Sequence, residues 1–270
     1  NVALGNQALE AVEAGGIQNT AVGNQSLENV TTGDNNIGVG HRTLCTLTTG
    51  SCNVAVGKDA LRTNTASSNT AIGQEALVAN TTGCRNSSFG SLSLDANTEG
   101  DTNVAVGYQS LSANTTADNN TAVGSFALLA NTTGTKNTSV GKSSLATNTT
   151  GDCNVALGVD ALTSATTASN NTAVGVSSLL SNTTGCRSVA IGAESLKANT
   201  TGVNNVASGF QSMLLNTEGS RNSAYGYSSL GSNTTGNCNT AIGCGSLGGN
   251  TTASDNTAVG FDSLKANTTG

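Results

Sequence analysis

Residues 120–136 read NTAVGSFALLANTTGTK, and close variants of this seventeen-residue unit fill the chain from end to end. Glycine occupies the fifth position of the unit sixteen times. The interval is seventeen residues, except for one of eighteen between Gly5 and Gly23 and one of sixteen between Gly57 and Gly73. A short fixed period over so many copies is typical of a solenoid, in which each unit buries its apolar face by stacking on the next.

Each position of the unit carries its own structural signal. Positions 2 to 4 are short and rich in β-branched residues, as in Thr121-Ala122-Val123, and the glycine that follows closes a predicted strand. That glycine and the Gly, Ala or Ser at position 15 mark two bends, which leave room for a second short strand in each coil. We therefore predict an all-β fold, a parallel β-solenoid of 16 coils of about 17 residues with two short strands per coil, as one domain over residues 1–270.

Position 9 predicts a buried row of aliphatic side chains. It is leucine in every unit except one, where Met213 replaces it, and such uniformity is typical of a core. Positions 3 and 8 accept only small residues. The predicted core row includes Leu61, Leu77, Leu94, Leu111, Leu128, Leu145, Leu162, Leu179, Leu196, Met213, Leu230, Leu247 and Leu264.

Positions 3 and 4 differ in a way that predicts association between chains. Neighbouring strand residues face opposite sides, so the small position 3 is expected inside and the larger, apolar position 4 outside. An apolar stripe along a solenoid exceeds what monomers normally expose, and side-by-side self-association, as a homotrimer or another homo-oligomer, would cover it. In the competing interpretation position 4 points inward and the protein is a monomer. The candidate interface residues are Val56, Ile72, Phe89, Val106, Val123, Val140, Leu157, Val174, Ile191, Tyr225, Ile242 and Val259.

Asparagine recurs at positions 1 and 12, in fifteen and twelve units. Equivalent residues of stacked coils lie about 4.8 Å apart, so their amides can bond along the stack as asparagine ladders. The Asn-Thr-Thr corner also creates candidate N-glycosylation sequons, but an amide committed to a ladder cannot carry a glycan. These sequons lie at Asn80, Asn114, Asn131, Asn148, Asn182, Asn199, Asn233, Asn250 and Asn267.

Segments such as Ser188-Val189-Ala190-Ile191-Gly192-Ala193-Glu194-Ser195-Leu196 and residues 103–110 resemble the head repeat of trimeric autotransporter adhesins, the YadA-like family. The resemblance covers the first half of each unit. It implies a left-handed parallel β-roll and three chains wound side by side in a surface fibre that attaches to host matrix or cells. Family heads repeat at about fourteen residues, and the extra Asn-Thr-Thr-Gly corner is a departure. The unit is also similar to repeats of phage and viral fibres.

Composition argues against several functions. The net charge of −6 and the absence of a basic stripe disfavour nucleic-acid binding, and no apolar run is long enough for membrane insertion. His41 is the only histidine, and the carboxylates at position 7, among them Asp59 and Glu194, are expected in solvent, so we expect no enzyme. We expect no cofactor and no metal, since the calcium-binding pattern of β-rolls is missing.

The seven cysteines lie mostly at positions 16 and 17, and no two occupy equivalent positions in adjacent coils. A disulfide framework within the chain is therefore not expected, whereas bridges between chains stay open. Both ends of the sequence lie inside a repeat without a polar cap, so we expect a segment of a longer protein.

These patterns favour a non-catalytic structural and adhesive fibre segment, extracellular and displayed on a cell or virion surface, with a host-surface or matrix ligand as a candidate partner. One alternative is a mechanical spacer stalk in a viral or phage fibre. A second is an ice-binding β-solenoid, because threonine fills position 13 in fifteen units. The adjacent threonines of positions 13 and 14 would point in different directions on a strand, which weakens this alternative.

Overall fold

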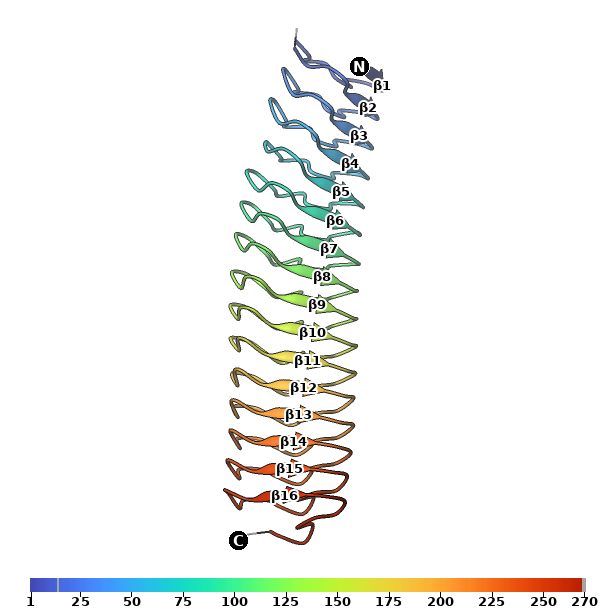
Figure 1. The fold of residues 1–270 in the computed structure, drawn as a ribbon. Coiled ribbons are helices and arrows are strands. Elements are labelled where there is room, and N and C mark those ends of the chain that lie inside the picture. The colour runs from blue at the N-terminus through green and yellow to red at the C-terminus, as the bar shows by residue number, and fades with distance from the viewer. Residues whose placement is uncertain (14, 269–270) are drawn as a thin grey trace. The chain divides into compact units, whose positions relative to one another are not determined.

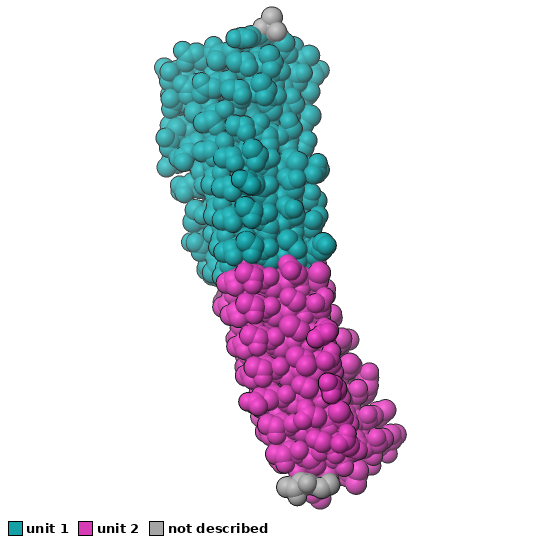
Figure 2. All heavy atoms as spheres, turned by 90° about the vertical axis from the view of Figure 1, so that its left-hand side faces the viewer, with its two compact units in different colours: residues 1–136 teal, residues 137–270 magenta. Residues whose placement is uncertain are grey.

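The computed structural model describes residues 1–13 and 15–268, and within these residues it contains sixteen three-residue strands and no helix (Figure 1). The chain forms two compact units, residues 1–136 and residues 137–270, which Figure 2 shows in different colours. The strands of the first unit are β1 (Val2–Leu4), β2 (Thr20–Val22), β3 (Ile37–Val39), β4 (Val54–Val56), β5 (Thr70–Ile72), β6 (Ser87–Phe89), β7 (Val104–Val106) and β8 (Thr121–Val123). Those of the second unit are β9 (Thr138–Val140), β10 (Val155–Leu157), β11 (Thr172–Val174), β12 (Val189–Ile191), β13 (Val206–Ser208), β14 (Ser223–Tyr225), β15 (Thr240–Ile242) and β16 (Thr257–Val259).

Within each unit every strand pairs in parallel with the next strand along the chain, position by position. In the second unit Ala156 lies opposite Ala173, which lies opposite Ala190. The register survives the one sixteen-residue interval, because Val54 still lies opposite Thr70. The prediction of an all-β parallel solenoid with about seventeen residues per coil is thus confirmed.

The prediction of two strands per coil is wrong, because in the part of the chain that the structure describes each coil has one strand and a turn at positions 6 to 11. Ser178 and Leu179, at positions 8 and 9, are neighbours in sequence and are both fully buried. A strand cannot place two successive side chains on the same side. The backbone solves this by entering the left-handed region at positions 7 and 9, with φ of 56° at Ser177 and 50° at Leu179.

The core consists of the small residues at positions 3 and 8 and of the leucine row at position 9. Ala156, Ala173 and their equivalents in β2 to β16 are buried, as are the leucines of the row. Leu264 differs, since half of its side chain (50%) is exposed. Position 3 therefore faces the narrow interior, as its restriction to small residues predicts.

The position-5 glycines are required for two reasons. Gly158 has a φ of +139°, which L residues rarely adopt. A β-carbon there would also lie 2.6 Å from the carbonyl oxygen of Gly175 in the next coil. The backbones of successive coils approach each other too closely at this corner for any side chain.

Both asparagine ladders are present inside the coils. In the first ladder, Asn36 donates its backbone N–H (2.8 Å) and its Nδ2 (3.2 Å) to Oδ1 of Asn19. In the second, Nδ2 of Asn199 donates to Oδ1 of Asn182 at 2.7 Å and to the carbonyl of Gly202 at 3.0 Å. The amides are buried and hydrogen-bonded, as buried polar groups need to be.

This burial argues against glycosylation of the sequons. Their asparagines are fully buried except Asn267, which is half-buried in the last coil. A glycan on one of the others would require its Nδ2 to leave the interior and abandon its hydrogen bonds. The asparagines concerned are Asn80, Asn114, Asn131, Asn148, Asn182, Asn199, Asn233 and Asn250.

Candidate interaction surfaces

The position-4 side chains form an apolar row on the outside of the sheet, which we call the outer row. The exposed fraction is 46% at Ile191, 44% at Tyr225 and 41% at Ile242, whereas the position-3 alanines beside them are buried. The interpretation in which position 4 points inward is therefore wrong. Position 2, which lies on the same face, is half-buried in β2 and in β4 to β15. The outer face of the sheet is thus a strip of apolar residues and short hydroxyl residues. Of the predicted interface, Val56, Val123 and Val174 are half-buried. The exposed residues are Ile72, Phe89, Val106, Val140, Leu157, Ile191, Tyr225, Ile242 and Val259.

The two threonine positions have different environments. At position 13 the hydroxyl bonds to the next coil: Thr183 donates to the carbonyl of Thr200 at 3.1 Å, and Thr200 donates to that of Thr217 at 3.0 Å. At position 14 the threonines, such as Thr184 and Thr201, are exposed. Glu99 and Glu218 interrupt the exposed row. The more uniform threonine row therefore holds the coils together, and its donors are already used.

Position 16 has a role that the sequence pattern did not suggest. Its side chain accepts the backbone N–H of the same position in the preceding coil, as Ser220 Oγ does from Val203 at 3.0 Å. Cys186 Sγ does so from Ser169 at 3.3 Å, and Asp101 Oδ1 from Cys84 at 2.7 Å. The signal was the restriction of position 16 to Asp, Ser, Thr, Cys or Asn in nearly every unit, which is typical of side-chain caps.

One carboxylate at position 7 is not solvated as expected. Asp59 is buried. Its Oδ1 lies 2.9 Å from Nε of Arg42 and 4.0 Å from Nη1 of Arg62, and its Oδ2 lies 3.6 Å from Nζ of Lys58. Arg42 occupies the same position in the preceding coil, so this ion pair runs along the stack. A charge this deeply buried needs such partners. Glu194 fits the expectation better: hydrogen bonds from Gln211 and Lys197 lower the pKa of its half-exposed carboxyl.

All seven cysteines are free in the described part of the chain. Burial, together with a hydrogen bond to Glu28, raises the pKa of the Cys45 thiol to about 11. Burial, together with a hydrogen bond to Asp101 and the negative charge of Asp101, also raises the pKa of the Cys84 thiol. A thiol with a raised pKa carries little thiolate at neutral pH and is a poor nucleophile.

Aromatic side chains gather at positions 6 and 7 of the turn side. In the first unit Tyr108 and Phe126 meet edge to face, with ring centroids 5.5 Å apart. In the second unit Phe210 and Tyr227, at position 6 of adjacent coils, are stacked at 5.9 Å with planes 21° apart. Next to this stack lies a groove of about 410 Å³, and its lining includes Tyr227, Cys244, Gly245, Phe261 and Asp262.

The described residues contain no group of three or more His, Cys, Asp and Glu side chains that could hold a metal ion. The only histidine, His41, is exposed at position 6. Among the described residues no helix is long and apolar enough to cross a membrane. Comparisons of the chain with protein-family models, with curated proteins and with solved structures found no match. The resemblance to YadA-like head repeats therefore stays a prediction that rests on the repeat pattern.

Proposed function

We propose that the chain is a non-catalytic structural and adhesive segment of an extracellular fibre, displayed on a cell or virion surface, and that copies associate side by side through the outer row. The observation that supports this most directly is the exposure of aliphatic residues at the same position of successive coils, as at Ile191 and Ile242. At about 25 cal/mol per Å² of apolar surface removed from water, covering such a row would favour association strongly. A homotrimer is the assembly that the family resemblance implies.

The adhesive part of the proposal rests on repetition. Coils of nearly equal length, stacked in register within each unit, present the variable positions 6, 7, 10 and 11 at regular intervals of about 4.8 Å. Weak contacts repeated along such an array add up, because the second and later contacts form at high effective concentration.

Solution mass tests the association. Sedimentation equilibrium at micromolar concentration is expected to give a trimer, and a monomer would overturn this part of the proposal. The double variant Ile191→Lys with Ile242→Lys places charges in the outer row and should dissociate the oligomer. Thr201→Lys with Thr252→Lys is the matched control, because these exposed threonines lie in the same coils on another face. If both double variants dissociate the oligomer, the added charge causes the dissociation and not the loss of contacts in the outer row.

Ice binding has one observation in its favour, the exposed threonines at position 14. A thermal-hysteresis assay separates it from adhesion. Activity that is lost in Thr184→Tyr with Thr201→Tyr, but kept in Val176→Tyr on the turn side, would replace the adhesive proposal. We expect no hysteresis, since most threonines of the uniform row at position 13 are half-buried and their hydroxyls, as at Thr183 and Thr200, bond to carbonyls.

A purely mechanical spacer differs from an adhesive segment only in its binding. Beads that carry many copies of the chain should be retained on immobilised extracellular-matrix proteins, and beads that carry few copies should be released. Avidity depends on the number of contacts that one bead makes at the same time. Equal absence of retention at both densities would favour the spacer.

A further inference from the structure

The groove on the turn side of the second unit is built by local exceptions to the repeat. Glycine replaces larger residues at four positions of two adjacent coils, Gly231, Gly245, Gly248 and Gly249. Apart from these four glycines, positions 7, 10 and 11 carry a side chain in all coils. Three of these glycines, together with the small Cys244, line the groove. The cavity therefore follows from missing side chains in an otherwise regular stack.

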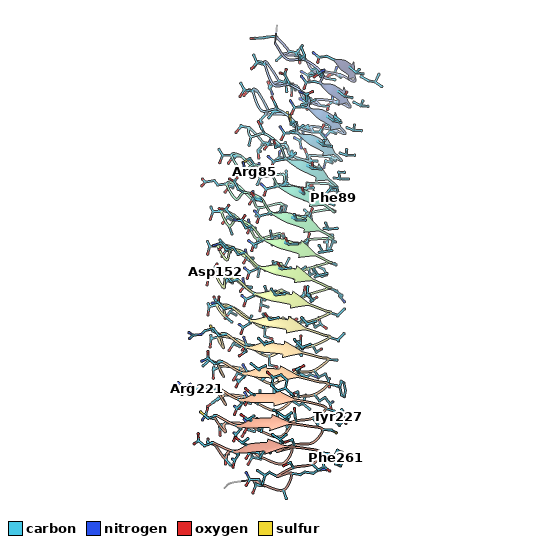
Figure 3. The ribbon with its side chains drawn as sticks, in the orientation of Figure 1. Arg85, Phe89, Asp152, Arg221, Tyr227 and Phe261 are labelled. Atoms are coloured by element: carbon cyan, nitrogen blue, oxygen red, sulfur yellow. The ribbon has the colours of Figure 1, made fainter. Side chains whose placement is uncertain are left out.

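The groove also interrupts a row of aromatic rings. Position 6 of successive coils carries Phe210, Tyr227, Cys244 and Phe261, so one ring is missing between Tyr227 and Phe261. Figure 3 shows the two labelled side chains on the same side of the second unit. Two coil spacings separate them by about 9.6 Å, which leaves one inserted ring about 4.8 Å from each neighbour. That distance lies within the range of aromatic stacking, and Phe210 with Tyr227 shows that adjacent rings at this position do stack.

The rim of the groove is polar. Lys265 Nζ lies 2.9 Å from Oδ2 of Asp262, and this ion pair borders the groove beside Phe261. Ser228 and Ser232 contribute hydroxyls to the same lining. The groove therefore combines apolar faces at its walls with donors and acceptors at its edge.

From this combination we propose that the groove is a carbohydrate-binding site that holds one pyranose ring between Tyr227 and Phe261. The C–H face of a pyranose is apolar and suits the negative face of an aromatic ring, while its hydroxyls both donate and accept hydrogen bonds. These hydroxyls can donate hydrogen bonds to the carboxylate of Asp262 and accept them from the ammonium group of Lys265. An aromatic side chain of a second copy would fill the slot but would offer no hydrogen bonds to the rim serines or to the remaining donors and acceptors of the Asp262–Lys265 pair, which is costly when these groups lose water.

The site does not depend on association through the outer row, because its lining lies on the turn side. The test uses the full 270-residue chain with cellotetraose, chitotetraose and xylotetraose as probes, each at millimolar concentration. Saturation-transfer NMR is expected to show transfer from the protein to ring C–H protons of at least one probe. Absence of transfer to all three would overturn the proposal.

Three variants locate the binding. Tyr227→Ala should weaken it about three- to tenfold, as loss of one stacking face predicts. Gly231→Leu should abolish it by filling the groove; position 10 holds leucine at Leu214 and Leu180 in other coils, so the coil tolerates the change. Tyr108→Ala in the first unit is the matched control and should have no effect.

Equal binding by Tyr227→Ala and the parent chain would overturn the proposal. So would a change of oligomeric state in Tyr227→Ala, since it would show that the slot holds a second copy. Position 6 accepts alanine at Ala193, so misfolding of Tyr227→Ala is not expected, and an unchanged thermal midpoint checks this. If the chain binds none of the oligosaccharides, the sedimentation experiment still tests association through the outer row independently.

Discussion

At the scale of the residue, the repeated glycine is explained by contacts that the sequence alone does not show. We predict that Gly158→Ala destabilises the second unit by about 2–4 kcal/mol, because a side chain is strained at this φ and also collides with the next coil. Gly185→Ala is the control. A β-carbon at Gly185 would also lie close to the next coil, 2.5 Å from the carbonyl oxygen of Gly202, but its φ is not positive and its position is alanine at Ala168 and Ala253, so the thermal midpoint should fall less. Similar losses in both variants would contradict the backbone strain at position 5.

Cysteine reactivity tests the environment of one side chain. Because the pKa of Cys45 is raised to about 11, its thiolate forms only as the pH rises toward that value. Alkylation by iodoacetamide at pH 8, followed by peptide mass spectrometry, should modify the exposed Cys52 faster than Cys45. Reaction of Cys45 should accelerate toward pH 11, and it should be fast at pH 8 in urea. Rapid labelling of folded Cys45 at pH 8 would contradict its raised pKa.

At the scale of the element, the sequence predicted the leucine row, the outer row and the asparagine ladders, but not the backbone between them. The uniform leucine at position 9 predicts a buried row whatever the backbone conformation is. The recurring asparagine at positions 1 and 12 likewise predicts the ladders. The left-handed residues at positions 7 and 9 could not be predicted, since Leu179 and its equivalents are residues that seldom adopt a positive φ. One signal in the sequence does point to a turn. The side chains at positions 8 and 9 each keep a nearly constant size, which is typical of buried residues, and a strand cannot bury two adjacent side chains on the same side.

The leucine row gives a graded prediction for one coil. Leu179→Ala should cost about 2–5 kcal/mol by opening a cavity, whereas Leu179→Met should cost less than about 1.5 kcal/mol, since Met213 fills the same position. Leu264→Ala serves as the control and should cost little, because its side chain is half exposed. Thermal unfolding followed by circular dichroism measures all three. A loss for Leu264→Ala as large as for Leu179→Ala would contradict the exposure of the last coil.

At the scale of the whole molecule, repetition makes the general features predictable and hides the particular ones. A consensus describes the coil, so the solenoid and the outer row could be predicted from it. The groove consists of departures from the consensus, at Gly231, Gly245 and Gly248, and scattered departures look like ordinary surface variation until the coils are stacked. Asp59 escaped prediction for the same reason, because Arg42, its ion-pair partner, lies one coil away.

Stacking also decides how the chain opens. Within one coil, Leu179 donates its N–H to Ser195 in the next coil at 3.0 Å, and Ser177 donates to Val159 in the preceding coil at 3.0 Å. Each coil thus depends on both neighbours, and stability should be a sum of nearest-neighbour terms. Hydrogen exchange measured by mass spectrometry should be slowest within each unit's central coils and fastest at residues 2–9 and 257–264. In Leu179→Ala, protection should fall around β10 to β12 and remain at β2 to β4. An equal loss of protection across all coils would show a globally cooperative molecule and would contradict the nearest-neighbour description.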